Sequence, residues 1–195
     1  MTLNMLIGIL EQGLIYGIMA MGLLITYRIL DFPDLTVDSS FPLGAAVSAT
    51  LTLQGVAPWL TLLIGCAAGG IAGLITGLIH VKCRVRDLLS GIITMTGLYS
   101  INLHIAQNKA NLPLFGGDTL FRNAFTKSLP KAISPYTTLI IIFLIALIAK
   151  ILLDLFLRTK CGYLLRAAGD NPSVVTTLSR DQGTVKILGL IIANA

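Results

Sequence analysis

A short polar segment interrupts the hydrophobic first half of the chain. Residues 31–40 contain three aspartates and several hydroxyl side chains. Carboxylates are costly to place against lipid, so we expect this segment to line a polar cavity. The candidate lining residues here are Asp34, Thr36, Asp38 and Ser40. An ordinary cytoplasmic loop with three solvated aspartates is the alternative.

The helix predicted after this segment is too short to cross a membrane alone. It runs from Phe41-Pro42 to about Leu53, which is about 20 Å at helical rise, against a hydrocarbon core of about 30 Å. We therefore predict a broken second span with residues 41–53 as its helical part. Irregular backbone at membrane depth is tolerated only against protein or a water-filled cavity, and broken helices commonly line the substrate path of transporters.

Another candidate span, residues 88–105, is unusually rich in polar side chains. They are Thr94, Thr96, Tyr99, Ser100, Asn102 and His104. We expect them to face the bundle or a translocation path, and we add Thr94, Thr96 and Asn102 to the candidate lining residues. A hydrogen bond near the membrane interface is our expectation for His104, with a pH-sensitive role as the alternative.

Residues 158–184 form a polar region between two hydrophobic segments. Residues 163–168 can form a short helix that Gly169 ends in the left-handed conformation. Asn171 is a suitable N-cap for a second helix, and Asp181 can cap the apolar segment that follows.

Four basic side chains mark this polar region: Arg158, Lys160, Arg166 and Arg180. Because the region is long, basic and structured, we interpret it as a docking surface on the cytoplasmic side. A plain juxtamembrane loop whose charges obey the positive-inside rule is the alternative.

The composition places the whole chain in a membrane. Of its 195 residues, 55% are hydrophobic and 12% charged, and the mean hydropathy is +0.86, which is too apolar for an ordinary soluble domain. The net charge of +5 lacks the basic and aromatic stripe of a nucleic-acid surface. The three widely spaced cysteines indicate neither a disulfide framework nor a metal site.

The predicted fold is an all-α, polytopic transmembrane bundle forming one domain over residues 1–195. We place the spans at 5–27, 41–53 (the broken one), 56–80, 88–105 and 136–157, with a sixth starting at 186. The sixth is cut short by the end of the sequence, so we expect the chain to be C-terminally truncated. Three basic residues within Lys82–Arg86 place that turn in the cytoplasm and the N-terminus outside. In the third span, Gly65, Gly69, Gly73 and Gly77 predict a close intramolecular helix seam.

The chain lacks the G-x-x-x-x-G-K-[ST] loop that cradles nucleotide phosphates. We therefore expect no enzyme activity, no bound cofactor and no metal in this chain. If nucleotide hydrolysis drives its function, another subunit must hold the ATP.

The run from Gly162 to Asn171 resembles the cytoplasmic coupling loop of ABC importer permeases, in particular the branched-chain amino acid permease family and its amino-acid branch. The spacing Gly162, Arg166, Ala167, Gly169, Asn171 carries the resemblance, together with Leu43-Gly44-Ala45. It implies that the loop, including Ala168 and Asp170, docks into an ATPase subunit. It implies a transmembrane permease for a small polar solute such as an amino acid, including the aromatic ones.

The resemblance also implies partners for the chain. These are ATP-binding cassette subunits, a second permease copy as a homodimer, an extracytoplasmic substrate-binding protein and the lipid of the cell membrane, without nucleic acid. A secondary transporter and a non-transporting membrane scaffold remain the alternatives. An inverted repeat would favour the former.

Overall fold

The computed structural model describes residues 2–109, 112, 119, 136–170 and 181–195. The predicted all-α architecture is confirmed, with the described residues forming helices and their connections. The helices, in chain order, are α1 (Thr2–Leu23), the π-helix η1 (Leu24–Ile29), α2 (Val37–Leu53), α3 (Pro58–Lys82), α4 (Asp87–Ile105), α6 (Thr137–Leu157), α7 (Lys160–Asp170) and α9 (Gln182–Asn194). Most of residues 107–135 lie outside the described residues.

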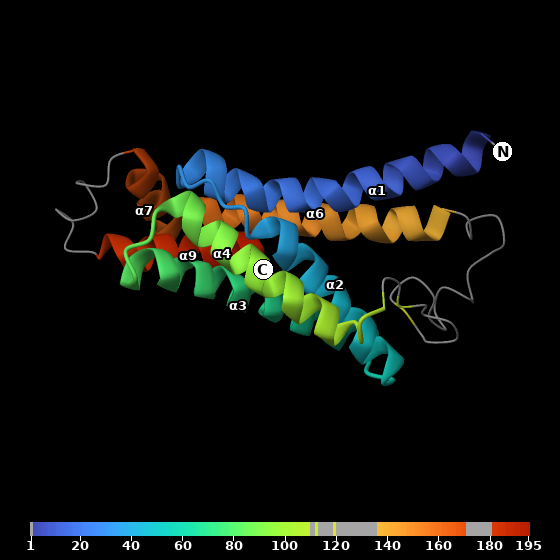
Figure 1. Cartoon of the computed structure of the whole chain (residues 1–195). Coiled ribbons are helices and arrows are strands. Elements are labelled where there is room, and N and C mark those ends of the chain that lie inside the picture. The colour runs from blue at the N-terminus through green and yellow to red at the C-terminus, as the bar shows by residue number, and fades with distance from the viewer. Residues whose placement is uncertain (1, 110–111, 113–118, 120–135, 171–180) are drawn as a thin grey trace.

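Two groups of helices make up the bundle. Helices α1 and α6 run side by side and form one group (Figure 1). In the other group, α2 packs on both α3 and α4, and α9 packs on α3. The two groups converge where η1 and α7 lie, and they diverge toward the end at which α1 begins. The turn between α3 and α4 and the beginning of α9 also lie at the convergent end, which agrees with their predicted location on one side of the membrane.

Within the described residues, four segments are long and apolar enough to cross a membrane. They are Met5–Ile29, Pro58–Lys82, Asp87–Ile105 and Thr137–Leu157, close to the predicted spans 5–27, 56–80, 88–105 and 136–157. Their outward side chains are largely apolar and exposed, as on α6, where Phe143 and Leu152 are 51% and 61% exposed. Such faces suit contact with lipid rather than water.

Helix α2 begins at Val37 rather than at the predicted Phe41, and it has 17 residues. The predicted helix began at Phe41-Pro42, but Pro42 lies inside α2. The additional turn forms because the Thr36 carbonyl accepts hydrogen bonds from the amides of Ser39 (2.9 Å) and Ser40 (2.8 Å).

The glycine seam of α3 is confirmed. A Cβ atom on Gly69 or Gly73 would collide with the backbone carbonyl oxygens of Asn194 or Leu190 in α9, and one on Gly77 would lie 3.0 Å from Ile187. The absence of side chains lets α3 and α9 approach closely, which is how helices associate in lipid, where dispersion replaces the hydrophobic effect.

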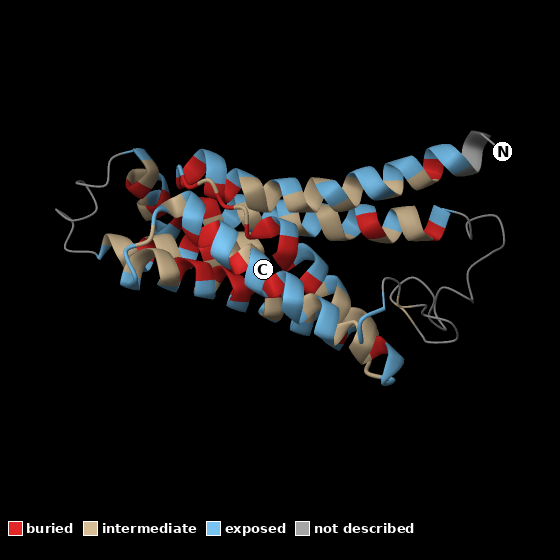
Figure 2. Ribbon diagram, in the orientation of Figure 1, coloured by how far each residue is buried: buried red, intermediate tan, exposed pale blue. Residues whose placement is uncertain are grey.

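Buried residues concentrate where η1, α7 and α9 meet (Figure 2). The apolar core there consists of Ile29, Leu30, Phe32, Leu157, Leu165, Ala168, Val185 and Leu190. This core holds the only amphipathic surface helix among the described residues, α7, against the end of the first membrane helix.

Candidate functional site

The first span does not lead directly into the second. Helix α1 continues into η1, and the chain then runs without helix from residue 30 to residue 36. Two hydrogen bonds close η1, from the Leu30 amide to the Ile25 carbonyl (3.0 Å) and from the Phe32 amide to the Thr26 carbonyl (2.9 Å). Phe32 is fully buried. The predicted break in the second span therefore lies against protein, as irregular backbone at membrane depth must.

Asp34 lies at the centre of this unwound segment and is 1% exposed. One carboxylate oxygen accepts a hydrogen bond from the Thr36 amide (2.9 Å), and the other accepts one from the Asn194 side-chain amide of α9 (2.8 Å). The side-chain oxygen Oδ1 of Asn194 in turn accepts a hydrogen bond from the Ser40 hydroxyl of α2 (2.7 Å). The alternative of a loop with three solvated aspartates is therefore wrong for Asp34, although Asp31 and Asp38 are exposed.

The same segment is also bonded to α3. The Thr36 hydroxyl lies 2.8 Å from the Thr76 hydroxyl, which donates to the Ala72 carbonyl (3.1 Å). Thr36 is therefore the donor in the first of these bonds. We call the connected set Asp34, Thr36, Ser40, Thr76 and Asn194 the polar joint.

Helix α4 contacts the first turn of α2 through polar groups next to the joint. The Ser39 hydroxyl donates to the Met95 carbonyl (3.0 Å), and the Asn102 amide donates to the Ser39 carbonyl (3.0 Å). Gly91 brings the α4 backbone close to the unwound segment, since a Cβ there would lie 3.0 Å from the Leu35 amide nitrogen. Helices α2, α3, α4 and α9 therefore all meet around residues 34–40.

The structure brings only some of the seven candidate path residues together. Asp34, Thr36 and Ser40 are in the polar joint, and Thr94 is buried on α4, where it donates to the Ser90 carbonyl (3.0 Å). The side chains of Asp38 and Thr96 are exposed in the single chain. Asn102 is half-buried, and its Oδ1 atom is buried without a partner among the described residues. A role of these seven residues in a translocation path stays a prediction.

Helix α7 forms a second candidate site at the convergent end. It runs from Lys160 to Asp170, longer than the predicted residues 163–168. Leu165 and Ala168 are buried in the apolar core, whereas Tyr163 is 60% exposed and Arg166 and Asp170 are exposed. The helix thus presents one face to the bundle and a polar face outward.

Our prediction for Gly169 was wrong in mechanism. Gly169 is helical, because α7 continues through it, and Gly55 is the only described glycine with a positive φ. A small residue is required at Gly169 for another reason: a Cβ there would collide with the Ile29 carbonyl oxygen of η1. Ala168 is also buried, whereas Gly169 is half-buried. Their docking to an ATPase subunit stays a prediction.

Gly162 has a similar packing role at the start of α7. A Cβ there would lie 2.5 Å from Leu157 Cα at the end of α6. Ala167 is half-buried. The remaining coupling candidate, Asn171, and the predicted second helix lie outside the described residues.

Asp181 caps α9 as predicted. Its carboxylate accepts hydrogen bonds from the Thr184 hydroxyl (2.8 Å) and from the amides of Gly183 (3.3 Å) and Thr184 (3.2 Å). The Thr184 hydroxyl bond, followed by the two amide bonds, lowers the pKa of Asp181 below its ordinary value. The cap fixes the beginning of the helix that carries Asn194 to the polar joint.

Comparison with known protein families adds to this geometry. The family described as "Branched-chain amino acid transport system / permease component" matches residues 5–195. The chain belongs to this permease family. With its several apolar helices, this permease is a multi-pass membrane protein.

Three relatives support the assignment. The permease is 43% identical over 189 residues to a "Tyrosine transport system permease protein" of Clostridioides difficile, covering 97% of the chain and 60% of that protein. It is 33% identical to an uncharacterized protein of Rickettsia prowazekii (98% and 64% covered) and 29% identical to a "Probable branched-chain amino acid transport permease protein" of Methanocaldococcus jannaschii (96% and 62% covered). The chain thus spans about three fifths of the length of these relatives. No solved structure shows a significant match.

Sequence reasoning missed two members of the polar joint, Thr76 and Asn194. Thr76 was detectable in part, because it is a polar residue within the apolar run of a candidate span, and such residues usually face the bundle interior. Asn194 follows the apolar run of α9. The sequence could not identify Asp34 as its partner, since the two residues are 160 positions apart.

Proposed function

We propose that this permease is the membrane-spanning part of an ATP-binding cassette importer that carries a small polar solute, an amino acid. The family description and the names of two relatives support an amino acid, and the tyrosine permease favours an aromatic one. ATP would be bound and hydrolysed by a separate subunit. A second permease copy and an extracytoplasmic binding protein would complete the importer.

The position of α7 is the observation that carries this proposal. Its outer face, with Tyr163, Arg166 and Asp170, is available to a partner. Its inner face contacts η1 at Gly169 and Ile29, and η1 leads directly into the unwound segment that contains Asp34. A displacement of α7 by an ATPase subunit would therefore reach the polar joint through packed backbone, without a flexible connection.

The path for the solute is proposed to run along the broken second span and α4. Asp34, Thr36, Asp38, Ser40, Thr94, Thr96 and Asn102 supply carboxylate, hydroxyl and amide groups that suit the charged amino and carboxylate groups of an amino acid. The exposed side chains of Asp38 and Thr96 would face the second permease copy or the solute.

The test is a charge reversal on the outer face of α7. The intact permease would be produced with its ATPase subunit, and copurification, ATP hydrolysis and uptake into vesicles would be measured for Arg166→Glu. Lys109→Glu is the matched control, because Lys109 is an exposed basic residue at the end of α4. We expect Arg166→Glu to lose copurification and uptake at a normal amount of permease, with Lys109→Glu unaffected. Normal coupling in Arg166→Glu would refute the docking surface.

The same vesicles distinguish a secondary transporter. Uptake driven by an ion gradient without ATP or the ATPase subunit would favour that alternative over an ATP-driven importer. An absence of any uptake with all subunits present would favour a scaffold.

A further inference from the structure

A basic groove lies at the convergent end of the bundle, between the α3–α4 turn and the first turns of α9. Its volume is about 400 Å³, and its lining includes Arg84, Arg86, Lys186, His80, Val81 and Val85. The described residues that line it include no acidic side chain. Two acids flank the groove: Asp181 is engaged by Thr184 and Gly183, and the Asp87 carboxylate contacts His80. The groove therefore has a local excess of positive charge.

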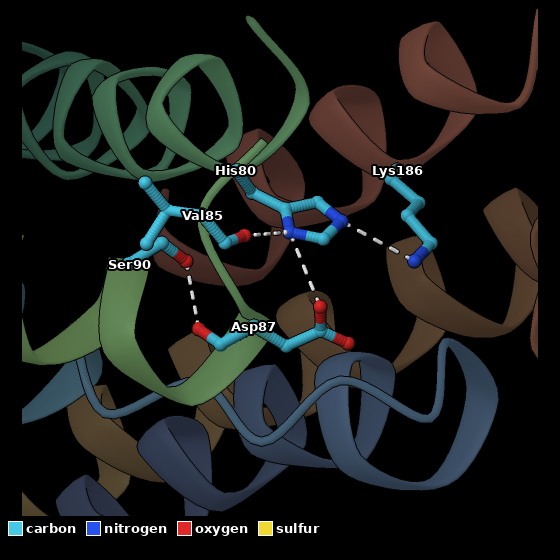
Figure 3. A network of polar contacts seen from close by, with 5 residues as sticks. All are labelled: His80, Val85, Asp87, Ser90 and Lys186. Carbon is cyan, nitrogen blue, oxygen red and sulfur yellow. Dashed lines mark hydrogen bonds and ion pairs between the residues drawn. The ribbon is translucent and has the colours of Figure 1, made fainter. Parts of the chain in front are cut away.

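The side chain of Lys186 is held toward this groove by His80 (Figure 3). His80 Nδ1 lies 2.9 Å from the Val85 carbonyl oxygen and 3.1 Å from the Asp87 carboxylate, so Nδ1 must carry the proton. Nε2 is then free to accept from the Lys186 ammonium at 3.3 Å. Asp87 is the first residue of α4, after Arg86 at the cap position. Its carboxylate is directed at His80.

The Arg84 backbone is unusual. Its φ of 54° lies in the left-handed region, which a long side chain adopts less readily than glycine or asparagine. Asparagine adopts this conformation more readily than arginine. The Arg84 side chain can therefore be replaced by asparagine without disturbing the backbone of the turn.

The depth of the groove matches the lipid headgroups. It lies where one candidate span ends at Lys82 and the next begins at Asp87. Basic side chains at this depth face the anionic headgroups of the bilayer surface. The position at the ends of two candidate spans therefore favours a phospholipid head over a free ion or an acidic protein segment.

We propose that this groove binds the phosphate of an anionic phospholipid headgroup, with Arg84, Arg86 and Lys186 as its charged ligands. A lipid bound there would bridge the α3–α4 turn and α9. These elements already touch at Gly183, where a Cβ would lie 2.5 Å from Val81. The lipid would thereby fix the beginning of α9 in the membrane plane.

The experiment measures lipid-dependent melting of the intact, purified permease in detergent. Phosphatidylglycerol would be titrated against phosphatidylcholine, which carries a phosphate without net negative charge, and against inorganic phosphate at equal phosphate concentration. We expect the melting temperature to rise with phosphatidylglycerol alone. An equal rise with phosphatidylcholine, or a rise with inorganic phosphate alone, would overturn an anionic-lipid site. An unchanged melting temperature with all three would also overturn it and would favour an acidic protein segment as the occupant of the groove.

Charge-matched variants test the location. Loss of two basic residues near a membrane surface weakens anionic-lipid binding about 25-fold if each contributes about fivefold. We expect this loss in Arg84→Gln/Lys186→Gln but not in Lys82→Gln/Arg158→Gln, which removes the same charge from exposed residues outside the groove. Equal losses in both pairs would show diffuse attraction and refute a defined site. Arg84→Asn, which suits the left-handed backbone, should lose lipid binding while retaining its lipid-free melting temperature; unchanged binding would exclude Arg84 as a ligand.

Discussion

Replacing Gly169 with alanine tests whether α7 is mechanically connected to the broken second span. The added Cβ would collide with the Ile29 carbonyl oxygen, a backbone atom that no rotamer change can move. Helix α7 must therefore shift away from η1 by roughly an ångström, and overpacking of this kind typically costs about 1–3 kcal/mol. If that contact transmits motion, the same range corresponds to a loss of coupling of about 5- to 150-fold.

The assay compares ATP hydrolysis with solute uptake in vesicles that contain the permease and its ATPase subunit. We expect Gly169→Ala to reduce uptake per ATP hydrolysed while the two subunits still copurify. Gly8→Ala is the matched control, because a Cβ on Gly8 meets nothing within 4 Å. Gly162→Ala disturbs the other attachment of α7, to Leu157 of α6, where the added Cβ would lie 2.6 Å from the carbonyl oxygen. Normal coupling in Gly169→Ala would refute transmission through this contact.

Three further outcomes are expected. Asp34→Ala leaves the Asn194 amide and the Thr36 N–H without their acceptor. Because hydrogen bonds in membrane proteins contribute about 0.6 to 1.7 kcal/mol each, the two losses should destabilise the permease by about 1–3 kcal/mol, measured by thermal melting, while Asp38→Ala, at an exposed position, should change little. Single-cysteine forms retaining Cys83 or Cys161, both exposed at the convergent end, should resist membrane-impermeant thiol reagents added to intact cells; strong labelling from outside would reverse the orientation. The cap bonds lower the pKa of Asp181 from 3.8. The Gly183 and Thr184 amides should therefore be protected from hydrogen exchange above pH 4, and this protection should fall as the pH drops through the lowered pKa. Protection that does not depend on pH would contradict the cap.

The membrane helices could be predicted because their signal is local. A run of about twenty apolar residues is sufficient to identify a span, and the four predicted ranges agree with the structure to within two residues at each end. The glycine seam of α3 was also predictable, since glycines four residues apart must share a helix face. Even there, the sequence could not identify α9 as the partner.

The two errors in the helix boundaries have different causes. Gly169 has the character of a helix terminator, yet α7 continues through it because Leu165 and Ala168 anchor the helix in the apolar core. That contact joins segments far apart in the chain, so the local sequence does not contain it. Pro42 suggested a helix start, but the Thr36 carbonyl accepts hydrogen bonds from the amides of Ser39 and Ser40 and adds an earlier turn.

The chemistry of the two contact types around the broken span indicates which part of the permease should move. Helices α3 and α9 meet through glycine-mediated backbone packing at Gly69, Gly73 and Gly77, which permits few alternative arrangements, so they should move as one body. The polar joint connects this pair to the unwound segment through hydrogen bonds, and interhelical hydrogen bonds in membrane proteins average only about 0.6 kcal/mol because released groups find other partners. Such bonds can be exchanged at low free-energy cost. The Oδ1 atom of Asn102, on the helix that contacts Ser39, is buried and has no partner within the described part of the chain, so it is an acceptor already in place for such an exchange. We therefore expect the unwound segment and α2 to rearrange against a fixed α3–α9 pair when α7 is displaced.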